Sequence, residues 1–172
     1  NLYGATPKSD YKDFLKLFDK EILPDELKLY PTSIIENTEL NEKYKNGKYR
    51  PYTTKELVDL ISKCVANVPK FIRINRLIRD IPGTDIVAGN KSTNLREVIE
   101  NNVRVSGGTL TDIRSREVKV RDIKENELKL NRIIYKTPYS TEYFLSFDTI
   151  KDDKIAGFLR LSLPHTKDIK NP

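Results

Sequence analysis

The sequence predicts an α/β unit followed by the first strands of an antiparallel sheet. One observation is that residues 53–82 form an amphipathic helix pattern, a strand pattern and then a polar loop, which together make half of a βαβ unit. Another is that four β-rich runs with few helix signals follow Gly107. At Ser106-Gly107-Gly108 the sequence changes from mixed helix and strand patterns to mainly strand patterns, which predicts a boundary between two structural units near Gly107.

The elements before residue 53 are short. Residues 6–21 predict an amphipathic helix with Ser9 as its N-cap and an apolar face made of Phe14, Leu17 and Phe18. Residues 27–35 predict a strand, in which Pro31 indicates a strand end, a bulge or an edge. Residues 40–44 then predict a helical turn, and the Asn46-Gly47 and Pro51 signals predict a loop over 45–52.

The helix that begins after Thr53 has the strongest pattern in the chain. Thr53 and Glu56 have the spacing of a capping box, and Pro69 marks the end of the helix. The apolar residues recur every three, four or seven positions, as one helix face requires, at Leu57, Leu60, Ile61, Cys64, Val65 and Val68. Residues 71–78 then alternate between apolar and basic side chains, which predicts a strand.

The remaining elements come after a polar, glycine-bearing stretch over 81–93. Asn94 is the expected N-cap of a second helix, with an apolar stripe of Leu95, Val98 and Ile99. The β-rich runs cover residues 118–123, 128–135, 143–147 and 155–163. Asp152-Asp153-Lys154 predicts a hairpin turn between the last two runs, where we expect the carboxylates to be solvated.

Composition restricts the function. The net charge of +6 and pI near 9.2 suit a polyanionic partner. No apolar run approaches the roughly 18 residues of a membrane span, and no signal-peptide pattern is present. Cys64 is expected to be a buried structural thiol and His165 a surface residue, so we predict no metal-binding and no catalytic residues. The sequence has no methionine and begins at Asn1, which we interpret as a segment of a longer protein.

Basic residues form the one candidate binding constellation. In a regular strand Arg73 and Arg79 share one face and Arg76 lies on the other. A phosphate-binding wall and a solvated basic surface with ion pairs to Asp80 and Glu97 fit this pattern equally well. The candidate nucleic-acid-binding residues are Arg73, Arg76, Arg79, Lys91, Arg96, Arg114 and Arg116.

Several segments, in order and at matching spacing, resemble one family. The segments are LKLYPTSII, NGKYRPYTTKELVDLI, RINRLIRDIP, NLREV and IRSREV. They are similar to the catalytic subunit of Elongator, a tRNA uridine acetyltransferase that joins a radical S-adenosylmethionine (SAM) domain to a GNAT-type acetyltransferase domain. The resemblance covers nearly the whole chain, from about Tyr3 to Leu163.

The resemblance implies a location within that fold. Residues 1–106 would form the carboxyl-terminal part of a radical-SAM partial TIM-type barrel, residues 107–126 a linker, and residues 127–172 the first antiparallel strands of the GNAT-type domain. It further implies a cytoplasmic enzyme that modifies the wobble uridine of tRNA at C5 with acetyl-CoA, SAM and an iron-sulfur cluster. Its partners would be tRNA and, in addition, other Elongator subunits or a second copy of the chain, with no membrane.

The family's cofactor motifs are not in this sequence. The cysteines that hold the cluster, the acetyl-CoA pyrophosphate loop and a late acetyltransferase tyrosine have no counterparts here. Many members carry zinc-binding cysteines in the linker, where this sequence has Leu110, Asp112 and Ser115. We therefore expect the segment alone to be inactive, supplying barrel wall, hinge and tRNA-facing surface. A non-catalytic RNA-binding homologue and a structural assembly component are the alternatives.

Overall fold

Helices and strands alternate through the first two thirds of the chain, and a hairpin sheet follows. The structure is a computed structural model that describes residues 1–77 and 81–165. The first group comprises α1 (Pro7–Lys16), β1 (Glu26–Leu29), β2 (Ile34–Ile35), α2 (Glu39–Lys45), α3 (Thr54–Val65), β3 (Arg73–Leu77), β4 (Ile86–Ala88) and α4 (Leu95–Val105). The second comprises α5 (Ile113–Arg116), β5 (Leu128–Lys136), β6 (Ser140–Thr149) and β7 (Ile155–Pro164).

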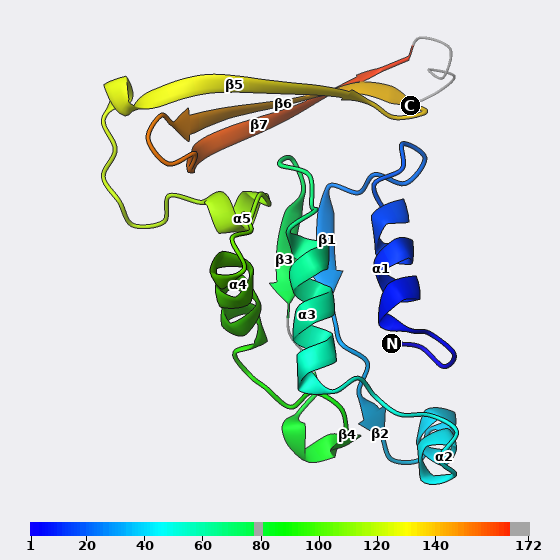
Figure 1. The fold of residues 1–172 in the computed structure, drawn as a ribbon. Helices are drawn as coiled ribbons and strands as arrows, with labels where there is room; N and C mark the ends of the chain where they lie inside the picture. Colours follow the sequence, from blue (N-terminus) through cyan, green and yellow to red (C-terminus); the bar gives the residue numbers. More distant parts are fainter. Residues whose placement is uncertain (78–80, 166–172) are drawn as a thin grey trace.

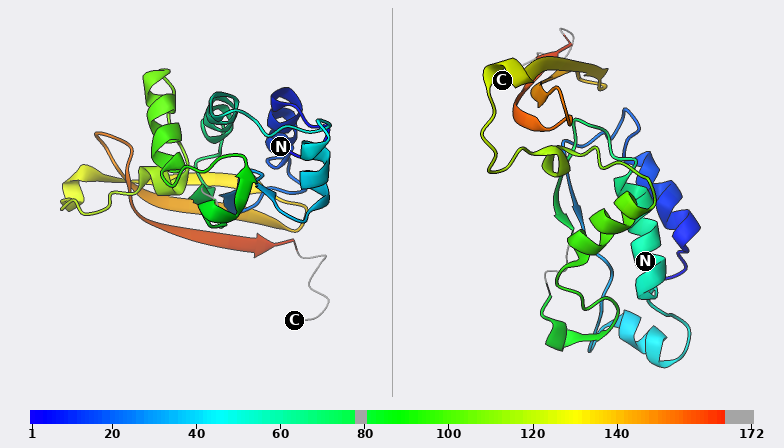
Figure 2. Two further views of the ribbon diagram at one scale, coloured as in Figure 1. Left: turned by 90° about the horizontal axis from the view of Figure 1, so that it is seen from below. Right: turned by 60° about the vertical axis from the view of Figure 1, so that its left-hand side comes forward.

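The strands form three separate sheets. β1 pairs in parallel with β3, β2 pairs antiparallel with β4, and β5, β6 and β7 form an antiparallel meander. Helices α1, α3 and α4 stand in a row on one face of the β1–β3 pair, and the β5–β7 sheet lies across the end where β1 and β3 begin (Figures 1 and 2). The amino ends of the parallel strands therefore face the sheet, and their carboxyl ends point away from it.

The central helix forms as its sequence predicts. The side chain of Thr53 accepts a hydrogen bond from the Glu56 amide, and the Glu56 carboxylate accepts one from the Thr53 amide, which completes the capping box. Its apolar face is buried against β1, β3 and α4, together with Ile72, which precedes β3, and Ile74 and Leu77 within β3. Cys64 is a buried free thiol, as expected.

The structure corrects the predictions for the first two elements. The N-cap of α1 is Thr6, because Pro7 suits the first helical position and starts the helix earlier. Ser9 is the third helical residue and the partner of Thr6 in the capping box. The run over 27–35 is divided between two strands in different sheets. Pro31 lies between β1 and β2 and has no backbone N–H to donate to a continuous ladder.

Two further predictions for the middle of the chain were wrong, and a third was confirmed in position only. Val98 is 38% exposed, and Val103 takes its place on the buried stripe of α4, because positions 95, 99 and 103 keep a strict spacing of four. Asn94 is the N-cap of α4 by position but makes no side-chain capping bond. Residues 118–123 form no strand; the isolated bridge to Ile155 is made by Glu117, the residue before them, and the Val118 amide donates to the Ile155 carbonyl.

The final sheet follows the predicted runs closely. β5, β6 and β7 extend each of the last three predicted runs by one to three residues at one or both ends, and the turn at residues 150–154 joins β6 to β7 as predicted. The inward face packs Phe144 and Ile155 with Ile113 of α5. The outward face leaves large apolar side chains in solvent, with Leu130 61% and Leu159 59% exposed.

Candidate nucleic-acid interface

A bulge in β3 changes which basic residues share a face. Leu27 pairs with Ile74 and Lys28 with Arg76, so Asn75 is an extra residue on β3. The buried positions Ile74 and Leu77 are consequently three residues apart. Arg73 and Arg76, also three apart, therefore both lie on the side away from the core, which a regular strand would not allow.

The edge of β3 that does not pair with β1 is covered by side chains and by α5. The Ile113 amide donates to the Ile72 carbonyl at 3.0 Å, and Arg96 Nη2 donates to the Ile74 carbonyl at 2.5 Å. Arg114 Nη1 donates to the next carbonyl, that of Asn75. Two arginines from different helices thus meet at the bulge and satisfy backbone acceptors that a neighbouring strand would otherwise take.

Arg73 joins the same group from the strand itself. Its Nε donates to Asn75 Oδ1 at 2.8 Å, and its Nη1 forms an ion pair with Glu117. Arg96 also pairs with Glu100 Oε1 at 2.9 Å, whereas the solvated-surface alternative named Glu97 as an acidic partner of the basic residues. The basic cluster at the bulge therefore contains carboxylates as well, which lowers its net positive charge.

The other sequence-predicted residues are distributed differently. Arg76 and Lys91 have exposed side chains, Arg76 beside the bulge and Lys91 in the loop after β4. Arg79, with the expected partner Asp80, lies outside the described residues. The structure therefore brings Arg73, Arg96 and Arg114 together at Ile74 and Asn75, with Arg76 adjacent in the strand.

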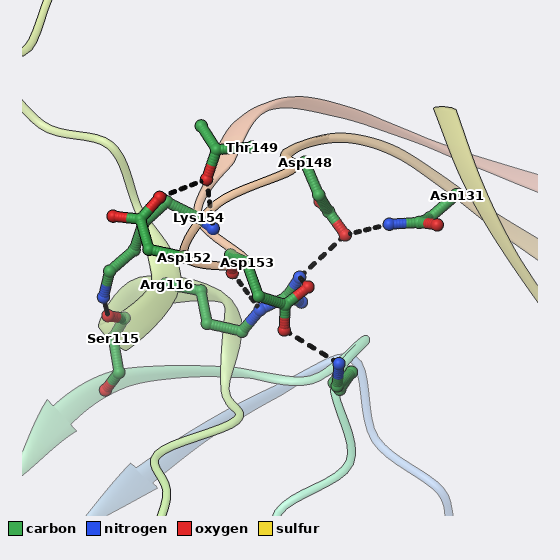
Figure 3. A network of polar contacts seen from close by, with 9 residues as sticks. Ser115, Arg116, Asn131, Asp148, Thr149, Asp152, Asp153 and Lys154 are labelled. Carbon is green, nitrogen blue, oxygen red and sulfur yellow. Dashed lines mark hydrogen bonds and ion pairs between the residues drawn. The ribbon is translucent and has the colours of Figure 1, made fainter. Parts of the chain in front are cut away.

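Arg116 lies in the interior and is held by the β6–β7 hairpin. Only 3% of the residue is exposed. Its Nη2 pairs with Asp148 Oδ2 at 2.8 Å and Asp153 Oδ1 at 3.1 Å, and its Nε donates to the Asp153 carbonyl at 2.9 Å (Figure 3). Asn131 on β5 donates to Asp148 Oδ2 at 2.6 Å. We therefore place Arg116 in an internal contact and not on a surface that a phosphate can reach.

The aspartates of the hairpin turn are ion-paired, not merely solvated as expected. Arg121 holds Asp152 through two hydrogen bonds of 2.8 and 3.1 Å, and Thr149 Oγ1 donates a third at 2.6 Å. Burial raises the pKa of Asp153, but hydrogen bonds and charge from Lys70 and Arg116 outweigh it and leave that pKa below its ordinary value. Residue spacing gave no signal for these contacts, because the partners are more than 30 positions apart.

The described residues offer no ligand set for a metal or an iron-sulfur cluster. Within residues 1–77 and 81–165, no three His, Cys, Asp or Glu side chains are placed to hold a metal ion. Burial raises the pKa of the Cys64 thiol to about 12, with Asp10 adding to the shift, so this sulfur is neutral and inaccessible. Among the same described residues, no helix has the length and hydropathy of a membrane span.

Comparisons with known proteins agree on one group of relatives. Residues 24–104 match the family described as the radical SAM C-terminal domain. The chain is 37% identical over 169 residues to the tRNA uridine(34) acetyltransferase of Methanocaldococcus infernus, covering 94% of this chain and 32% of that protein. It is 41% identical over 141 residues to Elongator complex protein 3 of Schizosaccharomyces pombe, covering 80% of this chain and 26% of that protein.

A solved structure shows the same fold. It is the archaeal Elp3 of Methanocaldococcus infernus with an N-terminal deletion, at a TM-score of 0.86 and 37% identity, covering 94% of this chain and 39% of that one. The likeness extends over both the α/β part and the β5–β7 sheet. The chain spans about a third or less of the length of the curated relatives it matches.

Proposed function

We propose that this chain, a homologue of Elongator complex protein 3 that carries a radical SAM C-terminal domain, is an interior segment of a tRNA uridine acetyltransferase. The reaction is modification of the wobble uridine at C5, with acetyl-CoA and SAM as cosubstrates. The observation that carries the proposal is the collinear match of 94% of the chain, at 37% identity, to a relative named for that activity. A TM-score of 0.86 to an archaeal Elp3 supports it.

We assign the parts of the segment as follows. Residues 1–106 are the end of a radical-SAM partial barrel, for which the parallel β1–β3 pair with helices on one face gives support. Residues 107–126 are a linker, and residues 127–172 begin a GNAT-type domain, in keeping with the antiparallel meander of β5, β6 and β7. In these assignments the segment connects the radical-SAM domain to the acetyltransferase domain.

The cofactors belong to the whole protein in this proposal. SAM and an iron-sulfur cluster serve the radical domain, and acetyl-CoA serves the acetyltransferase domain. The described residues contain no group of His, Cys, Asp or Glu that could hold a metal ion, so we assign none of them to the iron-sulfur cluster. The protein acts in the cytoplasm on tRNA, and other Elongator subunits or a second copy of the chain are further partners.

The tRNA-facing surface is the edge of β3 around the bulge. Arg73 and Arg114 bond to Asn75, and Arg96 bonds to the neighbouring Ile74 carbonyl. Arg76 directly follows Asn75, and both Arg76 and Arg114 are exposed residues. Such a cluster contacts phosphates and positions the RNA without reading its sequence. Lys91 and Arg79 complete the proposed set.

Binding and activity of the full-length protein test this proposal separately. We expect Arg76→Glu and Arg114→Glu to raise the Kd for tRNA about tenfold or more, and to lower the salt slope by about one unit per lost phosphate contact. Lys16→Glu is the matched control, because Lys16 is 61% exposed on α1, which lies beyond α3 from β3. If both variants bound tRNA with an unchanged Kd and without salt dependence, this surface would not be part of the tRNA site.

The acetylation assay distinguishes the alternatives. Acetyl transfer from acetyl-CoA to the wobble uridine, measured by mass spectrometry of digested tRNA, is the expected result for the full-length protein. Salt-dependent tRNA binding without acetylation would indicate a non-catalytic RNA-binding homologue. Absence of both would indicate a structural component.

A further inference from the structure

We propose that the contact between the β5–β7 sheet and the α/β part is a rigid joint, in which Arg116 and Arg160 are positioning residues. The joint consists of the residues before β1 and β3, helix α5, and the inward face of the sheet. Its geometry stands on the structure alone, whereas its role in fixing two reaction centres rests on the proposed function.

Arg160 connects β7 to the amino ends of both parallel strands. Its Nη1 pairs with Asp25, directly before β1, and its Nη2 donates to the Phe71 carbonyl, before β3, at 2.6 Å. Tyr135 on β5 lies 2.7 Å from the same Nη1, and the guanidinium stands 5.6 Å from the ring centre of Phe144. One side chain thus links two strands of one sheet with all three strands of the other.

An apolar contact lies beside Arg160. The rings of Phe71 and Tyr135 stack with their centres 4.0 Å apart and their planes at 15°. Phe144 and Ile155 pack with Ile113 of α5, and all three are at most 4% exposed. Stacked rings and a closed apolar cluster resist sliding, because movement would open voids that water does not fill well.

Arg116 holds the hairpin end of the joint. It belongs to α5, whose Ile113 amide bonds to β3, while its guanidinium is enclosed by Asp148 and Asp153 of the hairpin. Lys70, just before β3, pairs with Asp153 Oδ2 at 2.8 Å, so the α/β part also reaches the hairpin directly. The two arginines hold the sheet at different points along β6, Arg160 opposite Phe144 and Arg116 at Asp148, so together they oppose rotation and sliding between the parts.

The arrangement reverses the expectation that this region is a hinge. Hinges absorb backbone rotation in a few weakly packed residues. Here residues 111–118 bond to both parts of the structure. Thr111 Oγ1 donates to the Val68 carbonyl in the α/β part, and the Val118 amide donates to the Ile155 carbonyl in the sheet. A buried charge would lose its partners in any open state, so partly open positions are disfavoured.

Distance measurements on spin labels test the joint directly. In the full-length protein, cysteines replace the exposed residues Asn101 on α4 and Lys136 on β5, and pulsed dipolar spectroscopy gives the distance distribution. Cys64 stays unlabelled because it is buried with a raised pKa. We expect a single narrow distribution, and at least a twofold broadening in Arg160→Met and in Arg116→Met.

Controls separate positioning from stability. Arg121→Gln breaks an ion pair with Asp152 that lies outside the joint, and should leave the distribution narrow. Lys70→Gln alters a half-exposed side chain, so we expect this variant to fold even if an arginine variant does not. It should broaden the distance distribution by a smaller factor than the arginine variants. Arg160→Lys retains the charge at Asp25 and should recover part of the narrow distribution.

The outcomes are distinct. Broad distributions in the folded joint variants, with tRNA affinity unchanged and kcat for acetylation lowered, support the proposal. A broad distribution in the unaltered protein, or narrow distributions in folded Arg160→Met and Lys70→Gln, overturns it. Because no step of the distance measurement needs acetylation, failure of the proposed function would leave the result interpretable.

Discussion

Replacing Arg116 with methionine should destabilise the protein strongly. The change removes the charge and the donors but keeps an unbranched chain of similar reach. It leaves Asp148 without its ionic partner at a position where both side chains are 4% exposed. One Asp148 oxygen, Oδ1, already has no hydrogen-bond partner, so Asn131 would become the carboxylate's sole donor among the described residues.

The magnitude follows from the burial of the pair. Breaking a buried pair by removing one partner costs about 3–5 kcal/mol, because the remaining charge is left uncompensated. Solvent screens exposed pairs, so Arg121→Gln, at 49% side-chain exposure, should lose much less stability than Arg116→Met. The double variant Arg116→Met with Asp148→Leu should recover much of the loss, since apolar replacement of a whole buried pair is often close to neutral.

Urea unfolding followed by circular dichroism measures these free energies. Equal slopes between variants would confirm that the transition midpoints report stability. If Arg116→Met lost less than about 1 kcal/mol, or no more than Arg121→Gln, the argument from burial of this pair would be refuted.

Three further predictions concern single sites. Cys64, with a pKa of about 12, should not react with a thiol reagent at pH 8 in the native state and should react within minutes in urea, as read by absorbance. The pKa of Asp153 is lowered in the folded state, so its contribution to stability should be complete above its unfolded pKa of about 3.9 and should be lost as the pH falls through the folded value. Unfolding midpoints measured between about pH 2 and 6 test this expectation. Asp153→Asn should make the midpoint depend less on pH. Gly89→Ala should cost about 1–3 kcal/mol, because φ is +119° and a Cβ would stand 3.2 Å from the Thr32 carbonyl oxygen; an unchanged melting temperature would contradict this.

Local signals identified the regular elements well. The capping box at Thr53 and the four-residue and three-residue spacings after it are interactions within one helix, and the structure has them as predicted. The same holds for the runs that became β5, β6 and β7. Residues 118–123 were predicted to be a strand because valine and isoleucine have high strand propensity. In the structure Val118 bonds only to Ile155, and residues 119–123 have no strand partner.

The candidate site was less predictable, for two physical reasons. The bulge at Asn75 depends on how β3 pairs with β1, about 47 residues earlier in the chain, and it reversed the facing of Arg76. The interior position of Arg116 depends on a hairpin more than 30 residues later. Arg76 and Arg116 were both candidates because of their charge and their position in the sequence. Tertiary contacts decide that Arg76 is exposed and Arg116 is buried.

The orientation of β1 and β3 has a consequence for the path that a substrate must take. Ligands of parallel α/β sheets bind beyond the carboxyl ends of the strands, and here the β5–β7 sheet occupies the opposite end. A five-residue strand spans roughly 16 Å at about 3.3 Å per residue. Under the proposed function, a uridine that reacts beyond both ends of β1 and β3 has to cover at least this distance outside the strands. With a rigid joint between the two parts, the RNA has to move.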